Sequence, residues 1–264
     1  MARRSSVSIG TSMLILRSLA LLLVAGVAGA AAAEPVVLTA ADGVKVFGEV
    51  WRAQSEHSPV ILAFHQAESS HAEYATLAPR LNAAGFTVLA IDQRSGGRAF
   101  GGINQTVAKL GHSTGYDAAL PDLAAALAWG RTQARGAPVL IWGSSYSAAL
   151  VFALAARNPG KVAAVLAFSP GEYLGSPDAV RAAAKKVSVP VFVTQASDLE
   201  EIEQARSILA AVPGPDKVQF VPSKGGEHGS STLIRERNPA GADENWQAVL
   251  RFLARFKEPA KAPR

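Results

Sequence analysis

Apolar residues along the chain gather into short continuous runs that alternate with longer stretches of mixed polarity. Runs of this length without alternation are typical of strands buried on both faces of a parallel sheet. The six runs after residue 59 are Val60–Phe64, Phe86–Ile91, Val139–Trp142, Val162–Phe168, Val189–Thr194 and Val218–Val221. Two further runs, Val36–Thr39 and Val44–Trp51, flank the turn formed by residues 41–43 and predict an opening hairpin.

The stretches between these runs have helical periodicity and helix-ending residues. We expect helices over Ser70–Ala84, Gly115–Arg135, Tyr146–Arg157, residues 177–186, Glu200–Ala211 and Ala242–Phe256. Residues 92–113 are rich in glycine and are expected to be irregular. Strand–helix–strand repetition predicts an α/β fold, a mostly parallel central sheet with helices on both faces. Side chains that carry chemistry should then follow the carboxyl ends of the strands.

The first 33 residues differ from the rest of the chain. Basic residues lead into the apolar run Leu19–Val27, and the segment closes with small residues at Ala31–Ala33. This order is typical of a cleaved secretory signal, and the apolar run is short for a membrane-spanning helix. We therefore expect a signal peptide over 1–33, one α/β domain over 34–264, and a periplasmic or secreted protein without stable membrane insertion after cleavage. An uncleaved membrane anchor is the alternative.

Composition removes several classes of function. The 264 residues include no cysteine, which excludes disulfides, thiolate nucleophiles and cysteine-ligated zinc. The first 33 residues hold three arginines and no acid, so more than half of the net charge of +5 lies there. Since no Lys/Arg stripe interleaved with aromatic residues appears, we expect no nucleic-acid partner.

A serine nucleophile is the strongest chemical signal. The buried run 139–142 passes into a helix through Gly143, Ser144, Ser145, Tyr146 and Ser147 with no intervening loop. The residue at such an apex takes a strained backbone conformation, and its neighbours two positions away must be small. Centred on Ser145, those neighbours are Gly143 and Ser147, so Ser145 is the candidate nucleophile. A simple strand-to-helix turn with Ser144 as the cap is the alternative interpretation.

A serine hydroxyl needs a base, and the base needs a carboxylate to orient it. Among five histidines, His228 lies in a glycine-rich loop after the last predicted strand and before the last helix. Asp198 follows the strand that ends at Thr194, so we predict that Asp198 holds His228. Glu200 and Glu201 compete for this role, but they suit the acidic first turn of the next helix.

The tetrahedral oxyanion needs two backbone donors. The N–H of Tyr146 follows the nucleophile, and the N–H of Gln66, in the loop after Val60–Phe64, is the predicted second donor, with Ala67 as the fallback. His65 is expected to shape that loop and to border the substrate. Tyr173 and Leu174, after the strand that ends at Phe168, are further candidates for contact with the substrate.

The chain order Ser145, Asp198, His228 resembles that of the α/β-hydrolase superfamily. The resemblance is greatest to the small lidless serine hydrolases similar to dienelactone hydrolases and to the catalytic domains of prolyl-oligopeptidase-like enzymes. Residues 92–96 are similar to the Asp-x-Arg-Gly turn of that branch. The chain departs from the pattern at Ser147 in place of a glycine, at Gln66 in place of a glycine, and in using serine where dienelactone hydrolases use cysteine.

The resemblance implies hydrolysis of small or soluble carboxylic esters through an acyl-enzyme, without a metal or organic cofactor. About 20 residues separate the strands that end at Phe168 and begin at Val189, which leaves room for one short helix and no large cap. A peptidase or amidase with the same triad is one alternative. A secreted non-catalytic binding protein on a hydrolase scaffold is the other. The sequence determines neither the natural substrate nor the oligomeric state.

Overall fold

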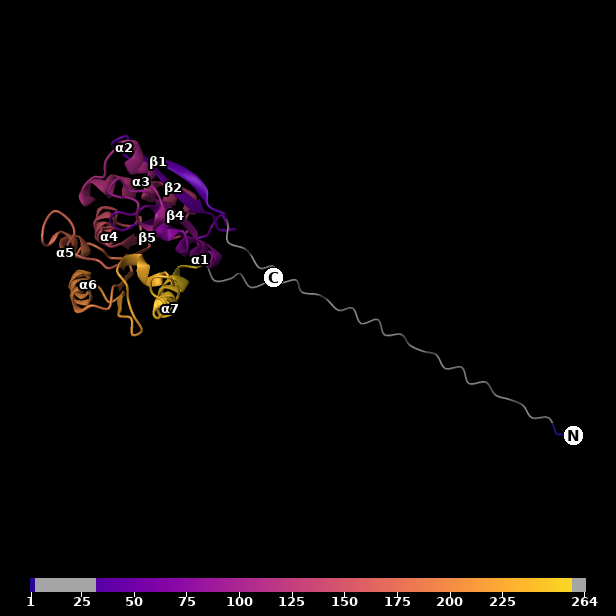
Figure 1. Cartoon of the computed structure of the whole chain (residues 1–264). Helices are drawn as coiled ribbons and strands as arrows, with labels where there is room; N and C mark the ends of the chain where they lie inside the picture. Colours follow the sequence, from indigo (N-terminus) through magenta and orange to yellow (C-terminus); the bar gives the residue numbers. More distant parts are fainter. Residues whose placement is uncertain (3–31, 258–264) are drawn as a thin grey trace.

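The computed structural model describes residues 1–2 and 32–257. The second of these ranges forms an eight-stranded sheet with helices on both faces (Figure 1). The strand order is β1-β2-β4-β3-β5-β6-β7-β8. The strands are β1 Glu34–Thr39, β2 Lys45–Trp51, β3 Val60–Phe64, β4 Thr87–Ile91, β5 Val139–Ser144, β6 Ala164–Phe168, β7 Val191–Thr194 and β8 Lys217–Phe220. The predicted α/β class is confirmed.

Strand direction follows the chain connections. β1 and β2 form the predicted hairpin, and β2 pairs antiparallel with β4. The remaining pairs, from β4 through β3 to β8, are all parallel. The carboxyl ends of six strands therefore meet at one edge, where loops after β3, β5, β6, β7 and β8 can converge.

The strands bury alternate side chains in two apolar layers. One layer packs Leu62 and Ile141 against α3, α4, α5 and α6, and the other packs Ile61 and Trp142 against α1 and α7. Because both faces are covered, β3 to β6 consist of buried residues throughout. The helices are α1 Leu77–Ala83, α2 Gln105–Leu110, α3 Leu120–Ala134, α4 Tyr146–Arg157, α5 Ala179–Ala184, α6 Leu199–Ala211 and α7 Ala242–Leu253.

Two predicted segments differ from the structure. The helix expected over 70–84 is divided into a 3-10 turn, His71–Tyr74, and α1. Pro79 explains the break, because its ring would collide with the carbonyl of Ala75 in a continuous helix. The glycine-rich segment 92–113 contains α2, which Asn104 caps by accepting a hydrogen bond from the N–H of Val107 at 2.8 Å.

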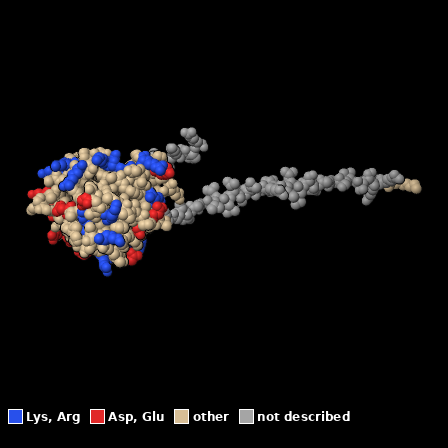
Figure 2. Space-filling view, turned by 90° about the horizontal axis from the view of Figure 1, so that it is seen from above, with Lys and Arg blue, Asp and Glu red and all other residues tan. Residues whose placement is uncertain are grey.

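No large cap covers the sheet edge, since α5 is the only α-helix between β6 and β7 in the described chain. Within residues 32–257, no helix is both long and apolar enough to cross a bilayer. Basic and acidic side chains are interspersed on the face that Figure 2 presents. The predicted signal segment lies almost wholly outside the described residues, and β1 begins at Glu34, directly after it.

Candidate active site

Ser145 stands at a sharp turn between β5 and α4. Its backbone φ of 58° and ψ of −123° lie outside the helical and extended regions, a conformation that costs about 1–3 kcal/mol. A Cβ at Gly143 would come within 2.2 Å of the carbonyl oxygen of Ser147, which explains the glycine there. The small residue that the sequence analysis required two positions before Ser145 is therefore needed sterically, and the turn presents the Ser145 hydroxyl at the beginning of α4.

His228 reaches Ser145 from the far end of the chain. Its Nε2 lies 2.8 Å from Ser145 Oγ, and it directly precedes the 3-10 turn Gly229–Leu233. Two bonds hold this loop on the sheet edge: the N–H of Gly229 donates to Ser169 Oγ, and the N–H of Ser230 donates to Ser144 Oγ, each at 2.8 Å. The predicted pairing of Ser145 with His228 is therefore present.

The carboxylate against His228 is Glu201, which corrects the prediction of Asp198. Glu201 Oε1 lies 2.6 Å from His228 Nδ1, and Glu201 Oε2 accepts a hydrogen bond from the N–H of Ala196 at 3.0 Å. Asp198 instead caps α6, its Oδ1 accepting from the N–H of Glu201 at 2.9 Å. Because a cap carboxylate is committed to its own helix, the longer side chain in the first turn is the one that reaches the imidazole.

The sequence contains a pattern that indicates Glu201 in place of Asp198. An aspartate followed three residues later by a glutamate is the pattern of a capping box, in which the first side chain caps the helix and the second turns back over its N-terminus. Asp198 and Glu201 have this spacing. Here Glu201 turns back past the cap to Ala196 and to His228.

Glu201 and His228 each shift the pKa of the other toward its charged form. The hydrogen bond that His228 donates to Glu201 raises the pKa of His228 above its usual 6.5, although burial opposes the shift. Burial would raise the pKa of Glu201, but hydrogen bonds from His228, Ser169 and the Ala196 N–H outweigh it and lower that pKa. The site therefore favours an ionised Glu201 beside an imidazole that accepts a proton readily.

The backbone donors differ in part from the prediction. The N–H of Tyr146 opens α4 and makes no hydrogen bond to the described protein atoms, as expected for an oxyanion donor. The N–H of Gln66 is occupied, since it donates to Glu73 Oε2 at 2.7 Å. The Gln66 prediction is thereby corrected, and the next amide, that of Ala67, has no acceptor among residues 32–257.

His65 shapes its loop and does not face substrate, which corrects the expected contact. It is fully buried, its Nε2 accepts from the N–H of Gln93 at 3.0 Å, and its Nδ1 lies 2.7 Å from the Gln66 carbonyl. Burial lowers the pKa of His65 to about 4, so the ring is neutral near pH 7. The Ser147 hydroxyl also holds this loop, because it donates a hydrogen bond to the His65 carbonyl at 2.6 Å.

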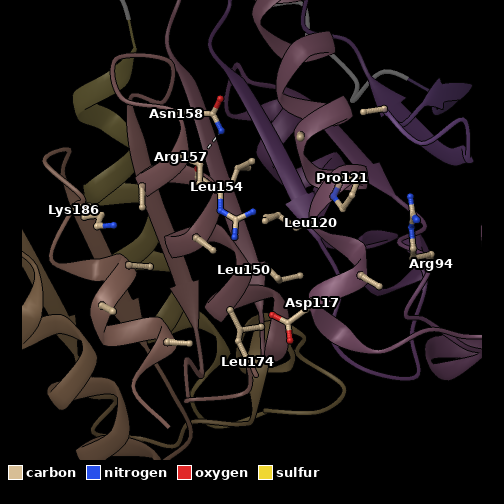
Figure 3. A pocket seen from close by; sticks show the side chains of 18 of the residues that line it. Arg94, Asp117, Leu120, Pro121, Leu150, Leu154, Arg157, Asn158, Leu174 and Lys186 are labelled. Atoms are coloured by element: carbon tan, nitrogen blue, oxygen red, sulfur yellow. Dashed lines mark hydrogen bonds between the residues drawn. The ribbon is translucent and has the colours of Figure 1, made fainter. Parts of the chain in front are cut away.

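Tyr173 and Leu174, the two residues after β6 that were predicted to contact substrate, lie in different places. Leu174 lines a groove of about 800 Å³ beside α4, together with Leu150, Leu154 and Arg157, and none of Ser145, Glu201 and His228 is part of that lining (Figure 3). Leu174 is thus placed with this groove. Tyr173 stays near the site, since Glu201 contributes to raising its pKa to about 12, after the larger effect of burial.

Tyr116 is an aromatic residue that the sequence analysis missed. Its ring stacks on that of Tyr146 at 4.4 Å between centroids, and its side chain is partly exposed. It also acts electrostatically on Tyr173. No local pattern marks Tyr116, because only the fold brings the 3-10 turn before α3 against the residue that follows the nucleophile.

Comparison with known protein families identifies the class. The model of the family described as serine aminopeptidase, S33 (Hydrolase_4), matches residues 55–199, just over half of the chain. The chain belongs to this family, and it is a serine hydrolase of the α/β-hydrolase superfamily. The match includes Ser145 and ends before Glu201 and His228. A search of curated proteins finds no significant match.

Solved structures show the same fold. Dienelactone hydrolase from Anabaena variabilis is similar at 18% identity and a TM-score of 0.65, over 86% of this chain and 99% of its own. The Pyrococcus furiosus esterase Pf2001 is similar at 19% identity and a TM-score of 0.63, over 86% and 94%. The Pyrococcus horikoshii acylaminoacyl peptidase is similar at 15% identity and a TM-score of 0.63, over 89% of this chain and 43% of its own. The predicted superfamily is confirmed.

Proposed function

We propose that this protein hydrolyses small or soluble carboxylic esters through a triad of Ser145, His228 and Glu201. One observation carries the proposal: His228 lies between the other two, with 2.8 Å from its Nε2 to Ser145 Oγ and 2.6 Å from its Nδ1 to Glu201 Oε1. Both distances are those of hydrogen bonds that a nucleophile, its base and an orienting acid require. A non-catalytic binding protein would need neither contact.

The reaction follows from these positions. Ser145 Oγ attacks the ester carbonyl while its proton passes to His228 Nε2, and ionised Glu201 stabilises the imidazolium. The carbonyl oxygen becomes an oxyanion that accepts hydrogen bonds from the Tyr146 and Ala67 N–H groups, each contributing about 3 kcal/mol to lowering the barrier. His228 protonates the leaving alcohol. Water then attacks the acyl-enzyme by the same steps and releases the acid.

The open edge supports the choice of a small substrate. Ser145 is 8% exposed and His228 has a side-chain exposure of 43%, with α5 alone inserted between β6 and β7. Tyr116 and Tyr173 are the aromatic candidates for contact with the acyl or alcohol part. A site without a large cap offers little apolar area to a long acyl chain, so short esters are the expected substrates.

A labelling and turnover experiment tests the proposal. The protein is treated with a fluorophosphonate probe and then assayed with p-nitrophenyl esters of increasing acyl length. We expect labelling and turnover of short esters, both lost in Ser145→Ala, while Ser188→Ala serves as a matched control on a loop outside the site. A wild-type protein that neither reacts with the probe nor turns over esters or amides would contradict the proposal.

An aminopeptidase is the second candidate, and the family description favours it. The same triad would then cleave an amide bond, with His228 protonating an amine as the leaving group. Aminoacyl p-nitroanilides distinguish the two activities. Turnover of these anilides with no turnover of esters would establish the peptidase in place of the esterase.

Export remains a proposal as well. The expected signal cleavage after Ala33 would make Glu34, the first residue of β1, the new N-terminus, so the fold would lose none of its strands. N-terminal sequencing of the exported protein tests it, and a mature chain that begins at residue 1 would contradict it.

A further inference from the structure

Three segments of the chain meet beneath Ser145. The first is the loop after β3 with Gln66, the second is the end of β5 with Ser144, and the third is the histidine loop with Gly229 and Ser230. Ser144 Oγ accepts from the N–H of Ser230 at 2.8 Å. A Cβ on Gly229 would lie 2.4 Å from Ser144 Oγ and 3.0 Å from Gln66 Oε1, so the packing leaves no room for a larger residue.

Glu73 adds a carboxyl group to this junction. It belongs to the 3-10 turn His71–Tyr74, it is 1% exposed, and its Oε2 accepts the N–H of Gln66 at 2.7 Å. The hydroxyls of Ser144 and Ser69 face the same carboxyl. The buried acid thus contacts the backbone of one loop and the residue just before the nucleophile.

The buried position of Glu73 reduces the stability of the fold. Burial raises the pKa of Glu73 to about 7, against the lowering effect of the surrounding donors. Glu73 Oε1 and Gln66 Oε1 are both buried with no hydrogen-bond partner among the described residues. A buried carboxyl with one unpaired oxygen destabilises a fold, and such groups concentrate at functional sites.

Glu73 and His228 also act on each other through space. The negative charge of Glu73 adds to that of Glu201 and Asp198 in raising the pKa of His228, and His228 in turn lowers the pKa of Glu73. The tyrosines that face Glu73 are Tyr74 and Tyr146, both buried. An anion at Glu73 therefore favours the imidazolium that forms when His228 takes the proton of Ser145.

We propose that Glu73 is a positioning residue of the hydrolase site, which fixes the Gln66–Ala67 backbone for oxyanion binding and supports the charge on His228. This inference rests on the proposed function. Because the Glu73 carboxylate takes the Gln66 N–H, the next N–H along the loop that is left without an acceptor among residues 32–257 is that of Ala67. The same carboxylate supplies negative charge on the opposite side of the nucleophile strand from Glu201, without touching substrate or the reacting atoms.

The test replaces the carboxylate by an amide of equal size, Glu73→Gln. We expect kcat for p-nitrophenyl acetate to fall about 10- to 100-fold with KM changed less than about threefold, since the loss falls on the transition state. The acid limb of kcat/KM should move to lower pH by about half a unit or more, because a negative charge near His228 is gone. Glu227→Gln is the control, as it removes an exposed charge next to His228 in the chain.

Two readouts separate a positioning role from a structural one. NMR titration of the His228 ring should give a lower pKa in Glu73→Gln and an unchanged pKa in Glu227→Gln. An unmoved His228 titration, or wild-type kcat, in Glu73→Gln overturns the inference while an active wild type leaves the proposed function standing. If Glu73→Gln does not fold, Glu73→Asp keeps the charge but shortens the reach; a wild-type kcat in that variant overturns the inference. An inactive, unlabelled wild type overturns the proposed function and this inference with it.

Discussion

His65 and His228 lie in two loops at the same edge of the sheet, and their side chains have different partners. His65 follows β3, is fully buried, and bonds to the backbone of Gln66 and Gln93. His228 follows β8, keeps a side-chain exposure of 43%, and lies between Ser145 and Glu201. Burial lowers the pKa of His65 to about 4, whereas Glu201 raises the pKa of His228.

The difference shows that partners, and not position after a strand, decide what a histidine does. The His65 ring lies in a dry interior, paired with backbone groups and the Asn104 amide and, within the described chain, with no carboxylate, so it is neutral and suited to hold a loop. A half-exposed ring with a carboxylate on one nitrogen and a hydroxyl on the other can receive and return a proton. Substitutions in the two loops should therefore affect different properties.

The largest effect is expected in the His228 loop. Ser145→Ala and His228→Ala should each lower kcat by about 10⁴–10⁶, and the double variant should be no slower than either single one because the residues act as a unit. Steady-state kinetics with p-nitrophenyl acetate measures this. A double variant that is much slower than both singles would show that they act independently.

The acid partner gives the next largest effect. Glu201→Gln should lower kcat by about 10³–10⁴, since a neutral amide neither enforces the required imidazole tautomer nor supplies the opposing charge. The acid limb of kcat/KM, which rises as His228 loses its proton, should move to lower pH in this variant because the charge that raises the pKa is removed. Glu203→Gln, on the same helix, is the matched control. Equal losses in both variants would contradict the assignment.

In the His65 loop we expect an effect on stability. The pKa of His65 is lowered to about 4 in the folded protein, so its contribution is present above pH 6.5 and is lost as pH falls toward 4. The difference in unfolding free energy between wild type and His65→Gln should shrink by up to about 3 kcal/mol over that range. Glu73, with a pKa raised to about 7, changes stability in the opposite sense, so the difference is measured and not the wild-type curve alone. His57→Gln, at an exposed position, should show no such slope.

The smallest expected effect tests whether Glu201, and not Asp198, is the acid that orients His228. Asp198→Ala should lower the unfolding free energy by about 1 kcal/mol, the usual value for a lost helix cap, and should change kcat less than about fivefold. Chemical denaturation and kinetics on the same preparation measure both. A loss of kcat equal to that of Glu201→Gln would restore Asp198 as the acid.

The sequence by itself determined the strands and the turn that holds the candidate nucleophile, Ser145. β3 and α4 have the predicted bounds, because a continuous apolar run and a strand-to-helix turn with small neighbours are local features. His228 was also predictable, since the order of elements places the last loop at the sheet edge. Each of these conclusions depends on residues that are close in the chain or on a simple order of strands and helices.

Only the tertiary structure decided which of two neighbouring residues is placed for the proposed chemistry. Asp198 or Glu201, and Gln66 or Ala67, are alternatives within one turn or one peptide of each other, and the sequence marks both members of each pair as suitable. The choice depends on the partner that each group meets in the fold: Asp198 caps its own helix, and the Gln66 N–H donates to Glu73. The capping-box spacing of Asp198 and Glu201 can be seen in the sequence. The contacts of His228 with Glu201 and Ser145 cannot, because only the sheet brings these distant segments together.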